Sequence, residues 1–272
     1  MSIRSDYRPY VPRLVAEWPE RGSWMQSQGT MVLADISGFT PMTERLSRMG
    51  KIGSEEVARI LNLVFAKLLT VAAELGGDFL KSGGDALLIW FSGPGHPSRG
   101  AAAAYRMRAA LDHIGKIDTI AGVVELDLTV GVHSGDFDFF LVGATHQELV
   151  VTGQAASSTV RVAAVAEPGQ ILVSDTTAGL LEQSAVGDGR SPGHLLTAEP
   201  TIDATPDLAK PALDSDLDQY VPQTLDGLLG NVGRDGEHRI ATIAFLDFEE
   251  SDYRIERQGG AEFAPTLDEL LR

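Results

Sequence analysis

Residues 30–40 read TMVLADISGFT, and this stretch decides the fold that the sequence predicts. Its first part, residues 30–36, is mainly apolar and ends in a Ser-Gly pair, which favours a short buried strand. Thr40 then precedes Pro41, and a capping residue followed by proline at the first helical position is typical of a helix start. The sequence therefore predicts a strand and then a helix, with a carboxylate, that of Asp35, at the end of the strand.

Further strands and helices follow on the C-terminal side of this stretch. From Ser54 onward, apolar residues recur every three or four positions until a Gly-Gly pair at Gly76, which predicts an amphipathic helix. The other patterns predict strands over 79–81, 86–91, 126–133, 137–142, 147–152 and 170–174, and helices over 99–114 and 154–166. The expected turns include Gly83-Gly84 and Ser134-Gly135. Together these elements predict an α/β sandwich with a mostly antiparallel sheet.

Three short segments recur later in the chain at nearly constant offsets. The second copies lie at 220–222, 242–247 and 260–262, which are 210, 212 and 207 residues after their first occurrences. We infer a tandem domain whose second copy is incomplete at Arg272. The expected organisation is a lead-in over 1–28, a first domain over 29–183, an acidic, proline-containing linker over 184–236 and the start of a second domain over 237–272.

The composition excludes several classes of protein. The 272 residues include 22 Lys plus Arg and 38 Asp plus Glu, so the net charge of −16 argues against a nucleic-acid partner. No apolar run approaches the roughly 18–20 residues of a membrane helix, and no signal peptide precedes the first domain, so we expect a cytoplasmic protein with no membrane partner. The absence of cysteine excludes thiolate metal sites and makes a hard cation such as Mg²⁺ the leading candidate.

Two carboxylates are the candidate metal ligands. Asp35 ends the first strand, and Asp85 follows Lys81-Ser82-Gly83-Gly84 at the tip of an expected hairpin. If the two strands pair, these carboxylates can hold two cations between them, and backbone amides at the helix start can hold phosphate oxygens. This arrangement suits phosphoryl transfer. Taken alone, each aspartate could equally be an ordinary turn or capping residue.

The order of four motifs resembles a known family. The motifs are ADISGFT, LKSGGDALL, VGVHSGD and VVTGQAASSTVRVAAVAEPGQILVS, and over residues 29–182 they resemble the class III adenylyl and guanylyl cyclase catalytic domain. GGDFLKSGGDALL and LVVTGQA are similar to the first catalytic half of soluble, bicarbonate-responsive adenylyl cyclases, which carry two such domains in tandem. The resemblance implies a ferredoxin-like, mostly antiparallel sheet with flanking helices, and a site built across a dimer of two halves.

The resemblance assigns a role to each motif residue. Asp35 and Asp85 match the two aspartates that bind two Mg²⁺ or Mn²⁺ ions, and the carbonyl of Ile36 matches a further ligand. The turn that binds the β- and γ-phosphates is matched by Ser37, Gly38, Phe39 and Thr40. Lys81 matches a lysine that contacts the purine in active sites, or bicarbonate in a regulatory pseudo-site. Arg161 matches the arginine that steadies the transition-state phosphate, or the anion in that pseudo-site.

The sequence departs from the family pattern at two positions. Val150 stands where the family has a base-reading Asp or Thr, and Ser157 stands where it has a transition-state Asn. In the second copy, Asp247 is kept but the phosphate-binding turn is replaced by Phe-Glu-Glu-Ser. The defects are complementary, so we expect one competent site that uses the aspartates of the first half and residues beyond the chain.

These patterns leave two functions open. The first is the catalytic half of a nucleotidyl cyclase that converts ATP to cyclic AMP and pyrophosphate, with this chain alone weakly active or inactive. The second is a non-catalytic domain that senses an anion or nucleotide and regulates a partner half. ATP is preferred to GTP on the resemblance alone, and the partner could be a second domain or a second copy.

We interpret His133 as a packed or turn-bonded residue rather than a ligand, and His96 as a surface residue.

Overall fold

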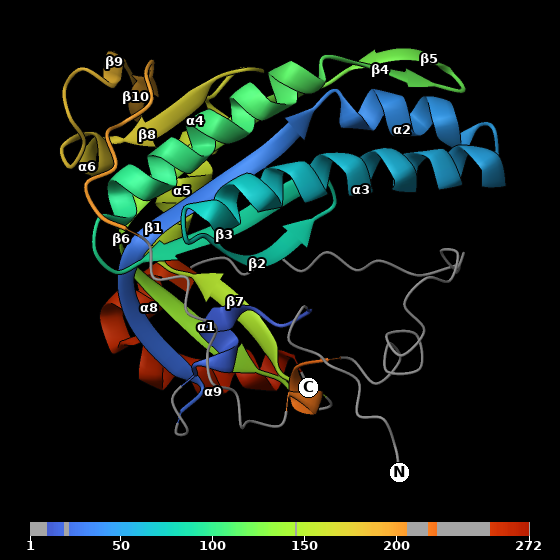
Figure 1. Ribbon diagram of the computed structural model, residues 1–272. Coiled ribbons are helices and arrows are strands. Elements are labelled where there is room, and N and C mark those ends of the chain that lie inside the picture. The colour runs from blue at the N-terminus through green and yellow to red at the C-terminus, as the bar shows by residue number, and fades with distance from the viewer. Residues whose placement is uncertain (1–9, 19–21, 145, 206–216, 222–250, 272) are drawn as a thin grey trace. The chain divides into compact units, whose positions relative to one another are not determined.

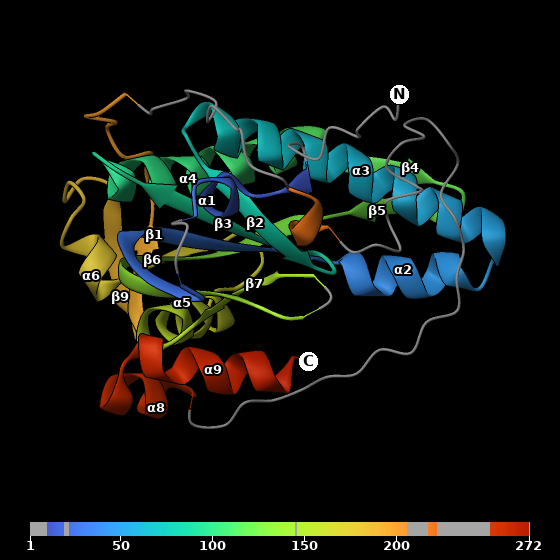
Figure 2. The same ribbon diagram turned by 90° about the horizontal axis from the view of Figure 1, so that it is seen from below.

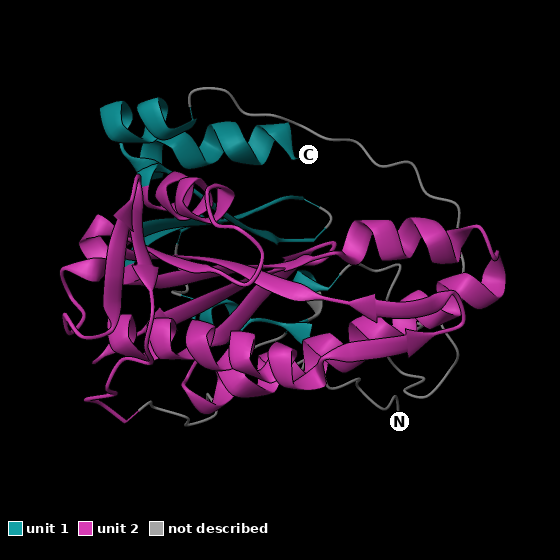
Figure 3. Cartoon of the chain, turned by 90° about the horizontal axis from the view of Figure 1, so that it is seen from above, with its two compact units in different colours: residues 1–27, 137–154, 209–272 teal, residues 28–136, 155–208 magenta. Residues whose placement is uncertain are grey.

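The computed structural model describes residues 10–18, 22–144, 146–205, 217–221 and 251–271. Contacts divide the chain into two compact units, which Figure 3 colours separately. The smaller unit comprises residues 1–27, 137–154 and 209–272, and the larger comprises 28–136 and 155–208. Two long strands, β1 (Trp24–Ser37) and β6 (Asp127–Val142), have residues in both units.

The larger unit is built on a mixed, mostly antiparallel sheet, which confirms the predicted fold class. Its strand order is β2-β3-β1-β6-β8-β10-β9, and the pairing of β6 with β8 is parallel. The strands other than β1 and β6 are β2 (Asp78–Gly83), β3 (Ala86–Ser92), β8 (Ile171–Ser174), β9 (Val186–Arg190) and β10 (Gly193–Leu196). A separate hairpin, β4 (Lys116–Thr119) and β5 (Gly122–Glu125), was not expected from the sequence.

Helices cover both faces of this sheet. Figure 2 shows α3 and α4 on one face and α5 on the other. Gly131 lets α5 approach β6 closely, because a Cβ at this position would lie 2.5 Å from the backbone nitrogen of Ala163. The helices of this region are α2 (Phe39–Ser47), α3 (Lys51–Glu74), α4 (His96–Ile114), α5 (Gln154–Ala164) and the short α6 (Asp175–Ala178).

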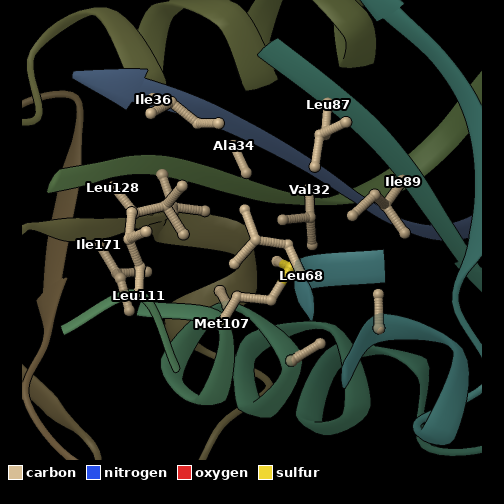
Figure 4. Packing of buried hydrophobic residues seen from close by; sticks show 14 of the residues in the cluster. Val32, Ala34, Ile36, Leu68, Leu87, Ile89, Met107, Leu111, Leu128 and Ile171 are labelled. Carbon is tan, nitrogen blue, oxygen red and sulfur yellow. The ribbon is translucent and has the colours of Figure 1, made fainter. Parts of the chain in front are cut away.

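The hydrophobic core lies between the sheet and helices α3 and α4 (Figure 4). Val32, Ala34 and Ile36 alternate along β1 and pack in this core with residues such as Leu68 and Met107. Since successive side chains of a strand point to opposite faces, the residues between them point away from this core. Asp35 is therefore placed on the face of the sheet opposite α3 and α4.

The smaller unit is built on a hairpin and two C-terminal helices. The end of β6 pairs with β7 (Glu148–Thr152), and the helices are α8 (Ser251–Gln258) and α9 (Gly260–Leu270). Phe140 and Phe263 meet edge to face at 5.8 Å, and the backbone amide of Gly143 donates to Asp268 Oδ1 at 2.9 Å. The unit also contains α1 (Arg13–Ala16) and a 3-10 turn, η2 (Asp218–Tyr220), both visible in Figure 1.

Three expectations about the fold are corrected. Helix α2 begins at Phe39, with Gly38 as its N-cap, so the predicted start at Thr40-Pro41 was too late. The predicted turn at Ser134-Gly135 is instead the middle of β6, because neighbours on both sides satisfy the Ser134 hydroxyl and allow it to be buried. Strands β9 and β10 extend the sheet into the start of the segment for which we expected an acidic, proline-containing linker.

Much of the remaining linker and the recurring segment at 242–247 lie outside the described residues. The domain boundaries that rest on them stay predictions. Within the part of the chain that the structure describes, none of the helices is long and apolar enough to cross a membrane.

Candidate active site

The end of β1 and the tip of the β2–β3 hairpin bring Asp35 and Asp85 together. Asp35 pairs with Ala86 on β3, and Ala86 pairs in turn with Gly83 on β2. The backbone amide of Ile36 donates a hydrogen bond of 3.3 Å to the carbonyl oxygen of Asp85. Both aspartates are partly buried, so this strand end carries two adjacent, accessible carboxylates.

The electrostatics of the pair favour a bound cation. Burial, and second the negative charge of Asp85, raise the pKa of Asp35 above its ordinary value. Two like charges held together destabilise each other, and a divalent ion between them removes that repulsion. Hard oxygen donors also match the preference of Mg²⁺ and Mn²⁺.

The number of protein ligands also fits such an ion. Among the residues that the structure describes, no group of three or more His, Asp or Glu side chains could hold a metal ion. Magnesium commonly binds through one or two carboxylates together with water and substrate phosphates rather than in an all-protein cage. Asp35, Asp85 and the carbonyl of Ile36 are therefore a suitable set for an ion that arrives with a phosphorylated substrate.

The turn after Asp35 is shaped by Gly38 and by neighbours from a distant segment. Gly38 has φ +87°, and a Cβ there would lie 3.0 Å from the carbonyl oxygen of Glu125. The hydroxyl of Ser37 lies 2.7 Å from that of Thr129. These contacts fix the entry into α2, whose first amides, those of Phe39 and Thr40, have no intrahelical partner and carry the positive end of the helix dipole.

Lys81 is on the same face of the sheet as Asp35. In the strand register, Lys81 on β2 is opposite Leu88 on β3, which is opposite Leu33 on β1. Leu33 lies two residues before Asp35, and residues two apart on a strand point to the same face. Lys81 is thus placed one step along the same surface that carries the carboxylates.

The other predicted site residues lie on β7 and α5. Val150 pairs with Phe140 and packs against the apolar cluster that includes Phe263. Ser157 is partly buried on α5, and Arg161 is exposed there and donates a 2.8 Å hydrogen bond to Ser158 Oγ. Arg161 and Lys81 are carried by different elements, and a shared pocket for the two stays a prediction.

Sequence reasoning missed two contributors to the turn, Glu125 and Thr129. They lie 90 and 94 residues after Asp35, in a segment with no motif that points to this turn. It also placed His96 at the surface, whereas His96 is half-buried with its Nδ1 2.8 Å from Thr30 Oγ1. The interpretation of His133 as a packed histidine agrees with its position, since its Nδ1 lies 2.8 Å from Ser174 Oγ.

The sequence matches the family described as "Adenylate and Guanylate cyclase catalytic domain" over residues 25–193, which is more than half of the chain. The chain belongs to this cyclase family. It is 28% identical over 173 residues to human adenylate cyclase type 10, a match that covers 62% of this chain and 11% of the human protein. The chain thus matches about a tenth of the length of this curated relative.

Solved cyclase domains share the fold. The guanylyl cyclase Cya2 superposes with a TM-score of 0.52 at 22% identity, over 65% of this chain and 93% of Cya2. The guanylate cyclase domain of RhGC from Catenaria anguillulae, solved in complex with GTP, gives a TM-score of 0.54 at 19% identity, over 64% and 99% of the two chains. These neighbours confirm the predicted α/β fold, a mostly antiparallel sheet with flanking helices.

Proposed function

We propose that this cyclase domain is the metal-binding half of an adenylyl cyclase site that converts ATP to cyclic AMP and pyrophosphate across an interface with a second half. The adjacency of Asp35 and Asp85, directly before the amides that begin α2, is the observation that carries the proposal. It combines ligands for a divalent ion with a helix N-terminus suited to a triphosphate.

In this proposal the chain's own residues bind and orient the substrate. Asp35, Asp85 and the Ile36 carbonyl hold two Mg²⁺ or Mn²⁺ ions, and the amides of residues 37–40 hold the β- and γ-phosphates. When bound, the ions lower the pKa of the ribose 3′-hydroxyl and neutralise charge on the leaving pyrophosphate. The raised pKa of Asp35 means that binding the ions must displace a proton at low pH, so activity should fall in acid.

The complementary residues would come from a partner half. Val150 offers no hydrogen-bonding group to a base, and its side chain packs in the apolar cluster with Phe140. Ser157 is shorter than the asparagine that the family uses to orient the ribose. This half therefore supplies the ion and phosphate contacts, while a second domain, or less favourably a second copy, supplies the base-reading residue and the transition-state amide.

The departures at Val150 and Ser157 also support a second candidate function, regulation by a bound anion. Lys81 and Arg161 keep their cationic side chains although Val150 and Ser157 depart from the pattern, which suits a regulatory pocket for a small anion such as bicarbonate. Arginine binds carboxylate-like anions through two parallel hydrogen bonds, and lysine adds a point charge. If bicarbonate stimulates the tandem protein and Arg161→Ala leaves the stimulation intact, this regulatory role is wrong.

Product analysis on the tandem protein tests the catalytic proposal. With Mg²⁺ or Mn²⁺ we expect cyclic AMP from ATP, and a lower rate from GTP, which is the substrate that the resemblance disfavours. Asp35→Asn and Asp85→Asn should each abolish turnover, while Asp188→Asn, an exposed carboxylate on β9, should leave it unchanged. Binding of ATP without any cyclic product, in a properly folded tandem protein, would favour the non-catalytic sensor instead.

A further inference from the structure

A continuous line of hydrogen-bonding groups crosses the core of the larger unit. Four hydroxyl groups connect two histidine rings, with successive separations of 2.8, 2.8, 3.1, 3.1 and 2.8 Å. The line draws on α4, β1, β6, α6 and β8, and its members in order are His96, Thr30, Ser134, Thr177, Ser174 and His133.

The middle of the line is sealed from solvent and its ends are not. Thr30 and Thr177 have no exposed surface, Ser134 is 1% exposed and Ser174 is 5% exposed. His96 and His133 are both half-buried, so solvent can reach each end. Water therefore does not replace the internal contacts, and the four hydroxyls must satisfy one another.

Counting hydrogens fixes the direction of the line. Four hydroxyls supply four hydrogens for five contacts, so one histidine must donate from Nδ1 and the other must accept there. The hydroxyl of Thr177 donates to Ser134. It follows that Ser134 donates to Thr30 and Thr30 to Nδ1 of His96, while Nδ1–H of His133 donates to Ser174.

We propose that this line, the hydroxyl relay, is a proton pathway that ties the protonation of His133 to that of His96. A proton that joins Nε2 of His133 lets Nδ1–H pass its hydrogen to Ser174. At each following hydroxyl one O–H bond forms as another breaks. The hydroxyl of Thr30 finally gives its hydrogen to Nδ1 of His96. His96 then releases its Nε2 hydrogen to solvent, so the transfer balances and leaves both rings neutral with their hydrogens on the other nitrogen.

The charged groups around the two rings favour passage over storage of a proton. Burial, and second the charge of Arg99 on the same helix, lower the pKa of His96. Burial, and second Arg161 on α5, lower the pKa of His133. Near the ends, Asp203 accepts a hydrogen bond from Ser98, and on α6 the Asp175 carboxylate lies 3.1 Å from His194 Nε2.

The relay links the two faces of the sheet, because His133 and Ser134 are consecutive on β6 and their side chains point to opposite faces. Ser134 is connected through Thr30 to His96 on α4, whereas His133 is within electrostatic range of Arg161 on α5. A change in the hydrogen position at one ring therefore alters the field at the other end without a change of fold. This inference is independent of the proposed cyclase activity and rests on the hydrogen-bond geometry alone.

Nitrogen NMR of the imidazole rings in the full 272-residue chain tests the relay. With both rings neutral, we expect the hydrogen on Nδ1 of His133 and on Nε2 of His96, and we expect the two rings to titrate as a coupled pair. Ser134→Ala and His96→Gln should each change the tautomer ratio of His133 by about tenfold, which corresponds to a coupling of about one pK unit.

The matched control removes a buried hydroxyl that is not part of the relay. Thr159→Val deletes a hydroxyl that donates to the Ala155 carbonyl at 3.0 Å, and it should leave both rings unchanged. His96→Gln alters only the half-buried end of the relay. It can therefore be measured instead if Ser134→Ala does not fold. An identical tautomer ratio of His133 in the wild type and in either folded relay variant would overturn the proposal.

Discussion

At the scale of single residues, the site places Asp35 where burial and the charge of Asp85 make its ionised form less favourable. Asp35 is partly buried beside Asp85, and the raised pKa of Asp35 records this cost. The partial burial that makes the ionised form costly without a cation also strengthens the attraction to a cation when one is present. A residue whose charged form is disfavoured in the fold is thus one of those proposed to bind metal.

Asp35→Asn should therefore stabilise the metal-free chain at neutral pH. Because folding raises the pKa of Asp35, its ionisation costs nothing below the ordinary carboxylate pKa, and the cost grows as the pH rises through the raised value. We expect a higher Tm for the variant at neutral pH and no difference in acid. Added Mg²⁺ or Mn²⁺ should raise the Tm of the wild type and of the control Asp188→Asn, but not that of Asp35→Asn. An equal metal response in Asp35→Asn would contradict the assignment of this ligand.

Gly38→Ala should be costly at the turn that follows. Its φ of +87° lies in the left-handed region, and the added Cβ would lie 3.0 Å from the Glu125 carbonyl. We expect a loss of about 1–2 kcal/mol in the free energy of unfolding, measured by urea denaturation. Gly83→Ala is the control, since a Cβ there meets nothing within 4 Å and its φ is not in the left-handed region. Equal effects of the two substitutions would show that the turn is not constrained.

At the scale of helices and strands, local patterns predicted most of the fold. The apolar spacing predicted α3, and the Gly83-Gly84 pair predicted the β2–β3 hairpin that presents Asp85. The failures have physical causes. A serine in mid-strand indicates a turn unless distant groups bond its hydroxyl, as Thr30 and Thr177 do for Ser134. Strands β9 and β10 are short, so only the pairing of β10 with β8 and of β9 with β10 reveals them.

For the candidate site too, local motifs predicted some residues, whereas contacts made by the tertiary fold were not predicted. Asp35, Asp85 and the turn between β1 and α2 lie in short motifs, and pairing of neighbouring strands was enough to expect their adjacency. The contacts from Glu125 and Thr129 depend on the tertiary fold and left no local pattern. The same holds for the hydroxyl relay, whose members are spread over five elements.

Phe263→Ala tests how the two C-terminal helices are held on the hairpin. Phe263 is 3% exposed and meets Phe140 edge to face, and its cluster includes Ile255 and Leu267. Truncation of a buried Phe typically costs about 3–5 kcal/mol. We expect faster amide hydrogen exchange in α8 and α9 with little change in α3. Tyr253→Ala, which removes a side chain that is 55% exposed, should leave exchange in α9 unchanged, and protection that survives Phe263→Ala would contradict this packing.

At the scale of the whole molecule, we propose that two halves contribute different residues to one site. This chain keeps the aspartates and the phosphate turn, whereas Val150 and Ser157 replace the residues that would complete a partner's site. The expected second copy keeps an aspartate, Asp247, but lacks the phosphate turn, because Phe-Glu-Glu-Ser follows it. On these two sets of departures we propose one complete site in a pair of halves.

The most direct measurement of this central claim is cyclic AMP formation from ATP by the chain alone and by the chain mixed with a separately produced downstream half. Removal of a transition-state donor from a preorganised site costs about 10²–10³ in rate, so the chain alone should be slower than the mixture by at least that factor. Asp35→Asn in this chain should abolish the activity of the mixture. Turnover by the chain alone at the rate of the mixture would contradict the account.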